Sequence, residues 1–308
     1  MARPPVRTRL AAAASAVAFT VLATALCFAP PRAAEARGGE MAPPPPAGAP
    51  VASPDMGLTL FDQCVRWVSM GGQGIQQTTD FYINIIAELD LDTMTHRGPM
   101  RLWWQAPDRF RQELTVSRNV TTKILNGDRL WIVDPRGRAQ RMHGTAGGVS
   151  AIRQLKEDRD RLGDLAQFLT LRSLMGDGAQ FFFEGEKEGN GSYAGRWLKL
   201  RRVAPGAAEM HFWLAFQRGA DGGYQATWPG IVRILGDPSR NLPTEDYILR
   251  SWKDPQRGAG QSFRYPEQID AYSLLPGRAP LRFLRATVRD IKINVGIDPA
   301  RFLPPGGR

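Results

Sequence analysis

The sequence predicts a mainly β fold of the α+β class, in which antiparallel strands are accompanied by helical segments. Apolar and polar residues alternate with period two from residue 81 onward, short turns separate the first of these runs, and two stretches repeat their apolar residues at helical spacing instead. Four or five alternating runs fall within residues 81–133. They leave no room for crossover helices, so the pattern predicts an antiparallel meander and not a βαβ unit.

Residues 1–36 have the features of a secretion signal. Three Arg and no acid precede an apolar stretch over residues 11–29, which is followed by the small-residue sequence Ala34-Glu35-Ala36. We expect cleavage near Ala36. The alternative is an uncleaved membrane anchor, although a helix of this length reaches only about 28 Å, barely the thickness of the hydrocarbon layer.

Residues 37–55 are dominated by Pro, Ala and Gly, with four consecutive prolines at 43–46. Such a segment favours extended polyproline II conformations and cannot build a core, so we interpret it as a tether. Residues 56–308 are then long enough for one domain with its own core. We expect this domain in the periplasm or cell envelope, anchored to the membrane if the leader is retained.

The two cysteines show which covalent modifications are expected in this protein. Cys27 lies within the leader and follows Leu26, whereas acylation sites of lipoproteins have a small residue there, so the sequence argues against lipid modification. Cys64 is then the single cysteine left, which excludes a disulfide framework and predicts a thiol packed within a helix.

The charge of the chain is strongly positive, at +10, and about +7 once four Arg and one Glu leave with the leader. The basic residues alternate with acids rather than forming a stripe, so no nucleic-acid partner is expected. A positive surface suits anionic membranes or acidic partners, or it is simply a solvated face.

Two helical stretches and a series of strands are expected along the domain. Residues 56–70 predict a helix ended by nearby glycines, and residues 147–175 predict one long helix or two shorter ones. Asn126-Gly127 predicts a hairpin turn, and a change of parity near Asp290 predicts a bulge in the last strand. The expected strands are 81–90, 100–105, 110–116, 121–125, 130–133, 180–184, 197–203, 210–216, 231–235, 247–252 and 281–294.

Signals for catalysis are scarce. His96, His143 and His211 have no metal-ligand spacing, and the motifs of nucleophile elbows, phosphate-binding loops and dinucleotide sites do not occur. Glu88, Asp90 and Asp92 share one strand face, which predicts a solvated edge or a weak cation site. We therefore expect a protein that is not an enzyme and has neither metal nor cofactor, with an unrecognised hydrolase as a remaining alternative.

The aromatic residues are more informative, because six of the eight Trp fall inside expected strands and residues 181–183 are all Phe. Rings therefore lie on both faces of a strand. Ordinary core packing explains this pattern, and so does a cavity lined for an apolar ligand.

The stretch from Gly98 to Arg141 resembles the periplasmic lipoprotein carriers and outer-membrane receptors of the LolA/LolB-like family. In that family a strand with an aromatic residue leads into x-Pro-x-x-Phe, and a later hairpin reads Asp/Asn-Gly-x-x-x-Trp-x-x-x-Pro. Residues 297–302 more loosely resemble the closing Pro/Phe element. The residues that match the two main motifs are Trp103, Pro107, Phe110, Asn126, Gly127, Trp131 and Pro135.

The resemblance implies an incomplete, strongly curved antiparallel β-barrel plugged by helices, which carries lipoproteins or lipids and holds their acyl chains in an apolar cavity. It also implies partners: an acyl lipid or lipoprotein, and a membrane-bound donor or receptor protein. The expected cavity residues are Trp103, Phe110, Leu114, Ile124, Trp131 and Val133, each of which is equally compatible with plain core. The expected lid residues are Leu162, Leu165, Phe168 and Leu169.

Two features depart from the family pattern. Ala106 stands where standard carriers have an Arg directly before the motif Pro, and residues 204–230 and 237–280 are expected to be insertions. The same fold occurs in lipid-sensing regulators and glycolipid-binding proteins, and fold alone does not choose among them. An envelope signalling or scaffold protein that binds a protein partner through its insertions is therefore the alternative hypothesis.

Overall fold

A computed structural model describes residues 54–72, 74–91, 94–116, 118–142, 146–176, 178–237, 243–254 and 263–306. The expected signal sequence, Cys27 and nearly all of the expected tether lie outside these residues. Within the described ranges, no helix is both long enough and apolar enough to cross a membrane.

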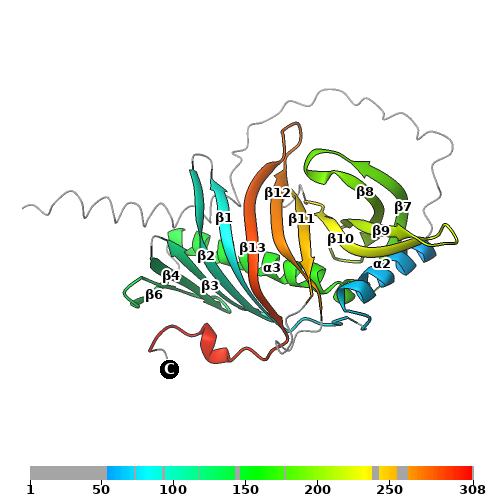
Figure 1. Cartoon of the computed structure of the whole chain (residues 1–308). Coiled ribbons are helices and arrows are strands. Elements are labelled where there is room, and N and C mark those ends of the chain that lie inside the picture. The colour runs from blue at the N-terminus through cyan, green and yellow to red at the C-terminus, as the bar shows by residue number, and fades with distance from the viewer. Residues whose placement is uncertain are drawn as a thin grey trace, which may run out of the picture.

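Thirteen strands form one antiparallel sheet (Figure 1) in the order β6-β5-β4-β3-β2-β1-β13-β12-β11-β10-β9-β8-β7. The strands are β1 (Asp80–Leu91), β2 (Met94–Gln105), β3 (Arg109–Val116), β4 (Asn119–Asn126), β5 (Arg129–Val133), β6 (Ala139–Met142), β7 (Gln180–Gly189), β8 (Gly195–Val203), β9 (Met210–Arg218), β10 (Tyr224–Ile234), β11 (Thr244–Lys253), β12 (Tyr265–Leu274) and β13 (Leu281–Ile293).

The sheet consists of two meanders, β1–β6 and β7–β13, that meet where β1 pairs with β13. The pairing runs from Phe81 opposite Ile293 to Leu89 opposite Leu284. One extra residue, Arg289, interrupts the register between Asp290 and Val288, which confirms the expected bulge. Because β6 and β7 remain unpaired edges of one strongly curved sheet, the expected incomplete antiparallel barrel is confirmed.

Helix α2 (Pro54–Val68) packs on β7, β8 and β10. Its buried residues Leu60, Phe61, Cys64, Val65 and Val68 follow the spacing of one helix face. Gly57 allows this close approach, since a Cβ there would lie 2.2 Å from the carbonyl oxygen of Phe181. The helix is therefore part of the core of the second meander.

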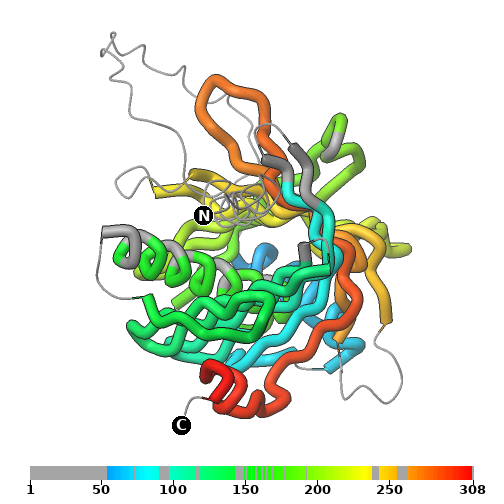
Figure 2. The backbone as a smooth tube through the Cα atoms, turned by 90° about the vertical axis from the view of Figure 1, so that its left-hand side faces the viewer, coloured from blue at the N-terminus to red at the C-terminus, as the bar shows by residue number. Residues whose placement is uncertain are grey.

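Helix α3 (Ala146–Thr170) connects the two edges of the sheet and packs on β2, β3 and β4. The short 3-10 helix η1 (Arg172–Met175) follows it, so the expected long helical stretch is one helix plus one additional turn. We call the face of the sheet that α2 and α3 cover the inner face. Figure 2 shows α3 on one side of β2–β4 and the C-terminal segment on the other.

The C-terminal segment after β13 is fixed on the outer face. The buried Asp80 carboxylate accepts hydrogen bonds from the backbone N–H groups of Val295 and Gly296, at 2.9 and 3.1 Å. The 3-10 helix η4 (Pro299–Phe302) then places the fully buried Phe302 on Ile124 and Val133. Arg111 donates to the carbonyl oxygen of Arg301 at 2.8 Å and holds this turn in place.

Several expectations were incomplete. The short edge strand β6 and the whole of β12 were missed, because neither shows clear alternation of apolar and polar residues. The two stretches expected to be insertions form strands of the sheet: residues 204–230 and 237–280 contain β9, most of β10, β11 and β12.

Candidate ligand site between the sheet and its helical cover

The inner face of the first meander is apolar along a continuous row of paired residues. From β13 to β6 the row consists of Ile293, Phe81, Trp104, Phe110, Leu125, Leu130 and Met142. All of these side chains belong to the main hydrophobic cluster, where Phe110, Leu125 and Leu130 are at most 1% exposed. The first meander therefore offers an apolar surface of considerable width beneath α3.

Helix α2 is tightly packed on the other half of this face. The ring of Phe61 stacks on Phe181 at 4.2 Å and meets Phe212 edge-on at 5.1 Å. Aromatic pairs of this geometry contribute about 0.5–1.5 kcal/mol beyond area burial. Buried Cys64 lies on the same helix face, and burial raises the pKa of its thiol, so it is a packing residue as expected.

Helix α3 contacts the sheet through an apolar stripe that is interrupted in its first half. Among its described residues the buried apolar side chains are Leu155, Leu162, Ala166 and Leu169, two turns apart at first and then one turn apart, and Gly163 lies against the indole ring of Trp104. Asp158 occupies the helix position between Leu155 and Leu162, where a continuous apolar stripe would have another large apolar residue.

The sheet places a cation opposite this acid. Lys123 lies on the inner face of β4 between Gln112 and Ile132, its partners on the neighbouring strands. Burial lowers the pKa of Lys123, and the negative charge of Asp158 raises it in part. The cost of removing two charged groups from water offsets much of their attraction. This pair therefore stabilises the contact between α3 and the sheet less than an apolar pair would.

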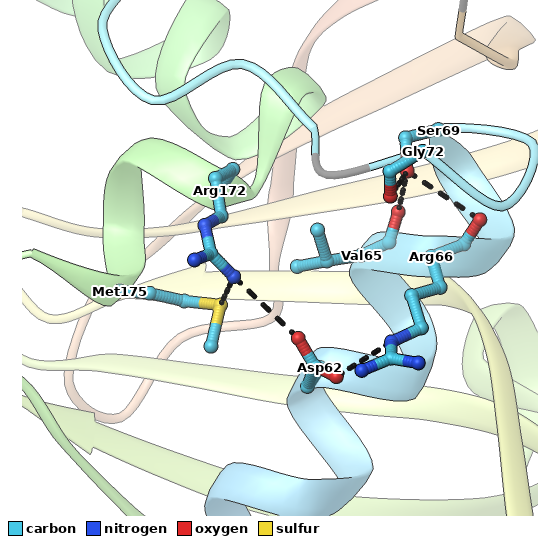
Figure 3. A network of polar contacts seen from close by, with 7 residues as sticks. All are labelled: Asp62, Val65, Arg66, Ser69, Gly72, Arg172 and Met175. Carbon is cyan, nitrogen blue, oxygen red and sulfur yellow. Dashed lines mark hydrogen bonds and ion pairs between the residues drawn. The ribbon is translucent and has the colours of Figure 1, made fainter.

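A polar network joins the end of α3 to α2 (Figure 3). Arg172 of η1 lies 3.5 Å from the carboxylate of Asp62, a residue of α2. Arg66, also in α2, contacts the same carboxylate at 2.8 Å. Arg172 lines a polar cavity of about 100 Å³ together with Asp62, Arg66 and Gly72. All three charged groups are partly exposed, so the connection between the two helices is solvent-screened and weak.

The structure does not bring the six expected cavity residues together. Phe110 and Leu114 lie on the inner face and belong to the same hydrophobic cluster as the expected lid residues Leu162, Leu165 and Leu169. The side chain of Phe168 lies outside the described part of the chain. The other four residues lie on the outer face beneath the C-terminal segment: Trp103, Ile124, Trp131 and Val133.

Strand parity explains this division, because neighbouring residues in a strand point to opposite faces. Trp103 and Trp104 are both aromatic, so the sequence does not show which one faces the helices. The pairing of Trp104 with Phe110, and of Phe110 with Leu125, is the signal that identifies Trp104 as the inner residue. Trp104 is the inner-face aromatic that the sequence analysis missed.

No cluster of His, Cys, Asp and Glu among the described residues is suited to hold a metal ion. The imidazole Nε2 of His211 lies 2.7 Å from Glu209, and Glu88 accepts a hydrogen bond from Arg282 at 3.1 Å. The side chains of His96, Asp90 and Asp92, and all of His143, lie outside the description. The inner face of the first meander thus combines apolar surface with the Lys123–Asp158 pair and the buried side chain of Gln112. On the second meander the buried polar groups are satisfied locally: Tyr247 donates to Glu245 at 2.6 Å and Arg202 donates to the carbonyl oxygen of Leu174 at 2.9 Å.

The fold and this face define a class of protein: one curved, open antiparallel sheet whose apolar inner face is covered by helices. No family model matches the chain, and no curated protein sequence matches it. Among solved structures it is similar to a DUF1329 family protein from Desulfovibrio piger, with a TM-score of 0.45, 12% sequence identity, and coverage of 82% of this chain and 99% of that one.

Two further structures belong to the class that the sequence motifs resemble. A LolA superfamily protein from Nitrosomonas europaea is 11% identical with a TM-score of 0.39, covering 77% of this chain and 92% of its own. A putative outer-membrane lipoprotein-sorting protein domain from Vibrio parahaemolyticus is 13% identical with a TM-score of 0.40. The match covers 81% of this chain and 97% of that one. A likeness of this degree does not extend to ligand or activity.

Proposed function

We propose that this protein is an extracytoplasmic carrier or binding protein for lipids or lipoproteins, which holds acyl chains between the inner face of the sheet and α3. The observation that carries the proposal is the contrast between the two helices. Helix α2 is built into the core by Phe61 and Phe181, whereas α3 covers an apolar surface through a stripe that the charged residue Asp158 interrupts. In this proposal α2 is a structural helix of the core and α3 is a lid.

The energetics favour exchange of the lid for a ligand. Each buried methylene contributes about 0.8 kcal/mol, so an acyl chain of about sixteen carbons contributes on the order of 10 kcal/mol before ordering costs. Among the described residues of α3, the buried apolar side chains are Leu155, Leu162, Ala166 and Leu169, and the Lys123–Asp158 pair adds little. An acyl chain therefore competes well with α3 for the row around Phe110 and Trp104.

In this proposal the protein needs no catalytic group, metal or cofactor. A membrane-bound donor or receptor protein would load or unload it, and an N-terminal secretion signal would place it in the periplasm or cell envelope. Phe110, Leu114, Leu162, Leu165 and Leu169 are the residues from the sequence-based set that we retain as ligand contacts, with Trp104 added.

The test is native mass spectrometry with lipid extraction, applied to the full chain expressed for export and purified from a bacterial periplasm. We expect acyl lipid or lipopeptide at close to one molecule per protein. An empty protein that also fails to take up a fluorescent fatty acid would exclude the proposal. A stoichiometric protein partner in that case would support the envelope scaffold instead.

A further inference from the structure

The outer face of the sheet has a cavity of about 380 Å³ that the proposed carrier function does not use. It lies between β1, β2 and β13 and the segment that follows β13. A volume of this size is typical of sites for small organic ligands and exceeds what an inorganic phosphate ion requires. Its lining residues are Tyr82, Arg101, Trp103, Lys292, Val295, Ile297, Asp298 and Arg301.

Strand register places two aromatic rings side by side on the floor of this cavity, with a cation on each side of them. Lys292, Tyr82, Trp103 and Arg111 are successive partners across β13, β1, β2 and β3. The rings of Tyr82 and Trp103 lie 5.2 Å apart, and the Lys292 ammonium lies 5.8 Å from the Tyr82 ring centre. The aromatic floor therefore has a positive charge at each end.

Arg301 reaches the same floor from the C-terminal segment. Its guanidinium lies 5.3 Å from the ring centre of Trp103, while that of Arg111 lies 5.7 Å from the same ring. A guanidinium stacked on an aromatic ring keeps its N–H edge available for a planar or tetrahedral anion. Among the described residues, Arg301 has no carboxylate within 4 Å.

The acids near the cavity only partly neutralise these cations. Glu113 contacts Arg111 at 2.7 Å and Arg101 at 3.7 Å, and Asp290 contacts Lys292 at 3.5 Å. Asp298 lines the cavity, but one of its oxygens accepts the backbone N–H of Ala300 and caps η4. The lining itself therefore contains three cations and one acid.

From this arrangement we infer a binding site for a phosphoester anion, of the glycerophosphate type, with its phosphate between Arg101, Lys292 and Arg301. A phosphate offers several acceptor oxygens and nearly two charges, which suits donors that converge from three sides. The carbon portion lies on the Tyr82 ring and beside Val295, whose side chain is 50% exposed at the rim. The site lies on the opposite face of the sheet from the proposed acyl site.

The chemistry is shared by a soluble phosphoester and by an anionic lipid headgroup, so the experiment has two arms. The full chain is titrated calorimetrically with glycerol 3-phosphate, and it is sedimented with vesicles of phosphatidylglycerol or of phosphatidylcholine. Binding in the first arm alone assigns a soluble ligand. Preference for phosphatidylglycerol vesicles assigns a lipid headgroup.

Variants decide whether the binding belongs to this cavity. Lys292→Gln combined with Arg301→Gln should weaken whichever binding is seen by about tenfold or more, since two charge-assisted contacts are lost. The matched control is Arg136→Gln with Arg278→Gln, two exposed cations in other turns, which should change it less than about twofold. Thermal unfolding confirms that both variants are folded.

Equal losses in the two double variants would show attraction to overall charge and would overturn the site. Absence of binding in both arms would overturn it as well. Neither result bears on the acyl ligand, because the fatty-acid measurement reports on the inner face alone.

Discussion

The Asp62 carboxylate lies 3.5 Å from the Arg172 guanidinium, and this ion pair joins the structural helix α2 to the end of the proposed lid. Both side chains are more than a quarter exposed, so the pair is worth at most about 1 kcal/mol. It lies where α3 would have to separate from α2 if the lid opens.

Replacing Arg172 with Gln should therefore affect opening more than folding. We expect uptake of a fluorescent fatty acid to accelerate by about two- to fivefold, with little change in unfolding temperature. Stopped-flow fluorescence and calorimetry measure the two quantities. The matched control is Arg66→Gln, because Arg66 contacts the same carboxylate from within α2; equal acceleration by both variants would contradict the role of the link.

The polar pair beneath α3 gives a second prediction. Lys123→Met with Asp158→Leu should make the helix–sheet contact apolar, raise the free energy of unfolding by about 1–4 kcal/mol and slow uptake of the probe. Asp158→Ala alone should destabilise the fold by about 1–3 kcal/mol, because it removes the carboxylate that favours the buried lysine charge.

Urea unfolding and stopped-flow uptake measure both effects. Asp160→Leu, on the exposed face of the same helix, is the control and should change neither quantity appreciably. A double variant that is more stable yet takes up the probe at the original rate would show that α3 is not the gate.

Trp104 of β2 and Trp131 of β5 lie on opposite faces of the sheet, so substituting each allows the two faces to be compared. Trp104→Ala should weaken binding of the fatty-acid probe by about tenfold, since Trp104 lies on the inner face beneath Gly163. Trp131→Ala removes a ring that packs under the C-terminal segment, so it should destabilise the fold by about 2–4 kcal/mol and leave the affinity within twofold. Equal losses of affinity in equilibrium titrations would disprove the assignment of the two faces.

The free energy of unfolding at alkaline pH should report on the hydrogen-bond network around the buried Asp246. Tyr193 donates to Asp246 at 2.7 Å, and Arg233 donates to both carboxylate oxygens at 2.6 and 2.8 Å. Burial first, and then the hydrogen bond to Asp246, raise the pKa of Tyr193 well above its usual 10.0. The unfolded chain loses this proton near pH 10, whereas the folded chain keeps it.

Stability from Tyr193 is therefore fully present below about pH 10 and is lost as the pH rises further. Tyr193→Phe should cost about 1–2 kcal/mol near pH 8, and this cost should shrink by up to about 1.4 kcal/mol for each pH unit above 10. Urea unfolding of both proteins at several pH values measures the difference. A cost that stays constant to pH 11 would contradict the raised pKa.

The local pattern of residues was sufficient to predict the antiparallel meander, the hairpin at Asn126-Gly127, the bulge beside Asp290 and the two helices. Each of these depends on periodicity or turn chemistry that a short stretch of chain contains in full. The regular alternation along β1 and β3 made them easy to recognise. β12 was missed because both of its faces are largely covered, which removes the alternation.

Only the tertiary structure decided whether each residue lies on the inner or the outer face of the sheet. Trp103 and Trp104 differ by one position, and a shift of one residue moves a side chain to the other side of the sheet. The sequence determined that the domain is a β-rich fold with an apolar surface and a helical segment to cover it. The fold decided that α2 is core and α3 is the cover, and it brought Tyr82, Trp103, Lys292 and Arg301 together, because those contacts join segments about two hundred residues apart.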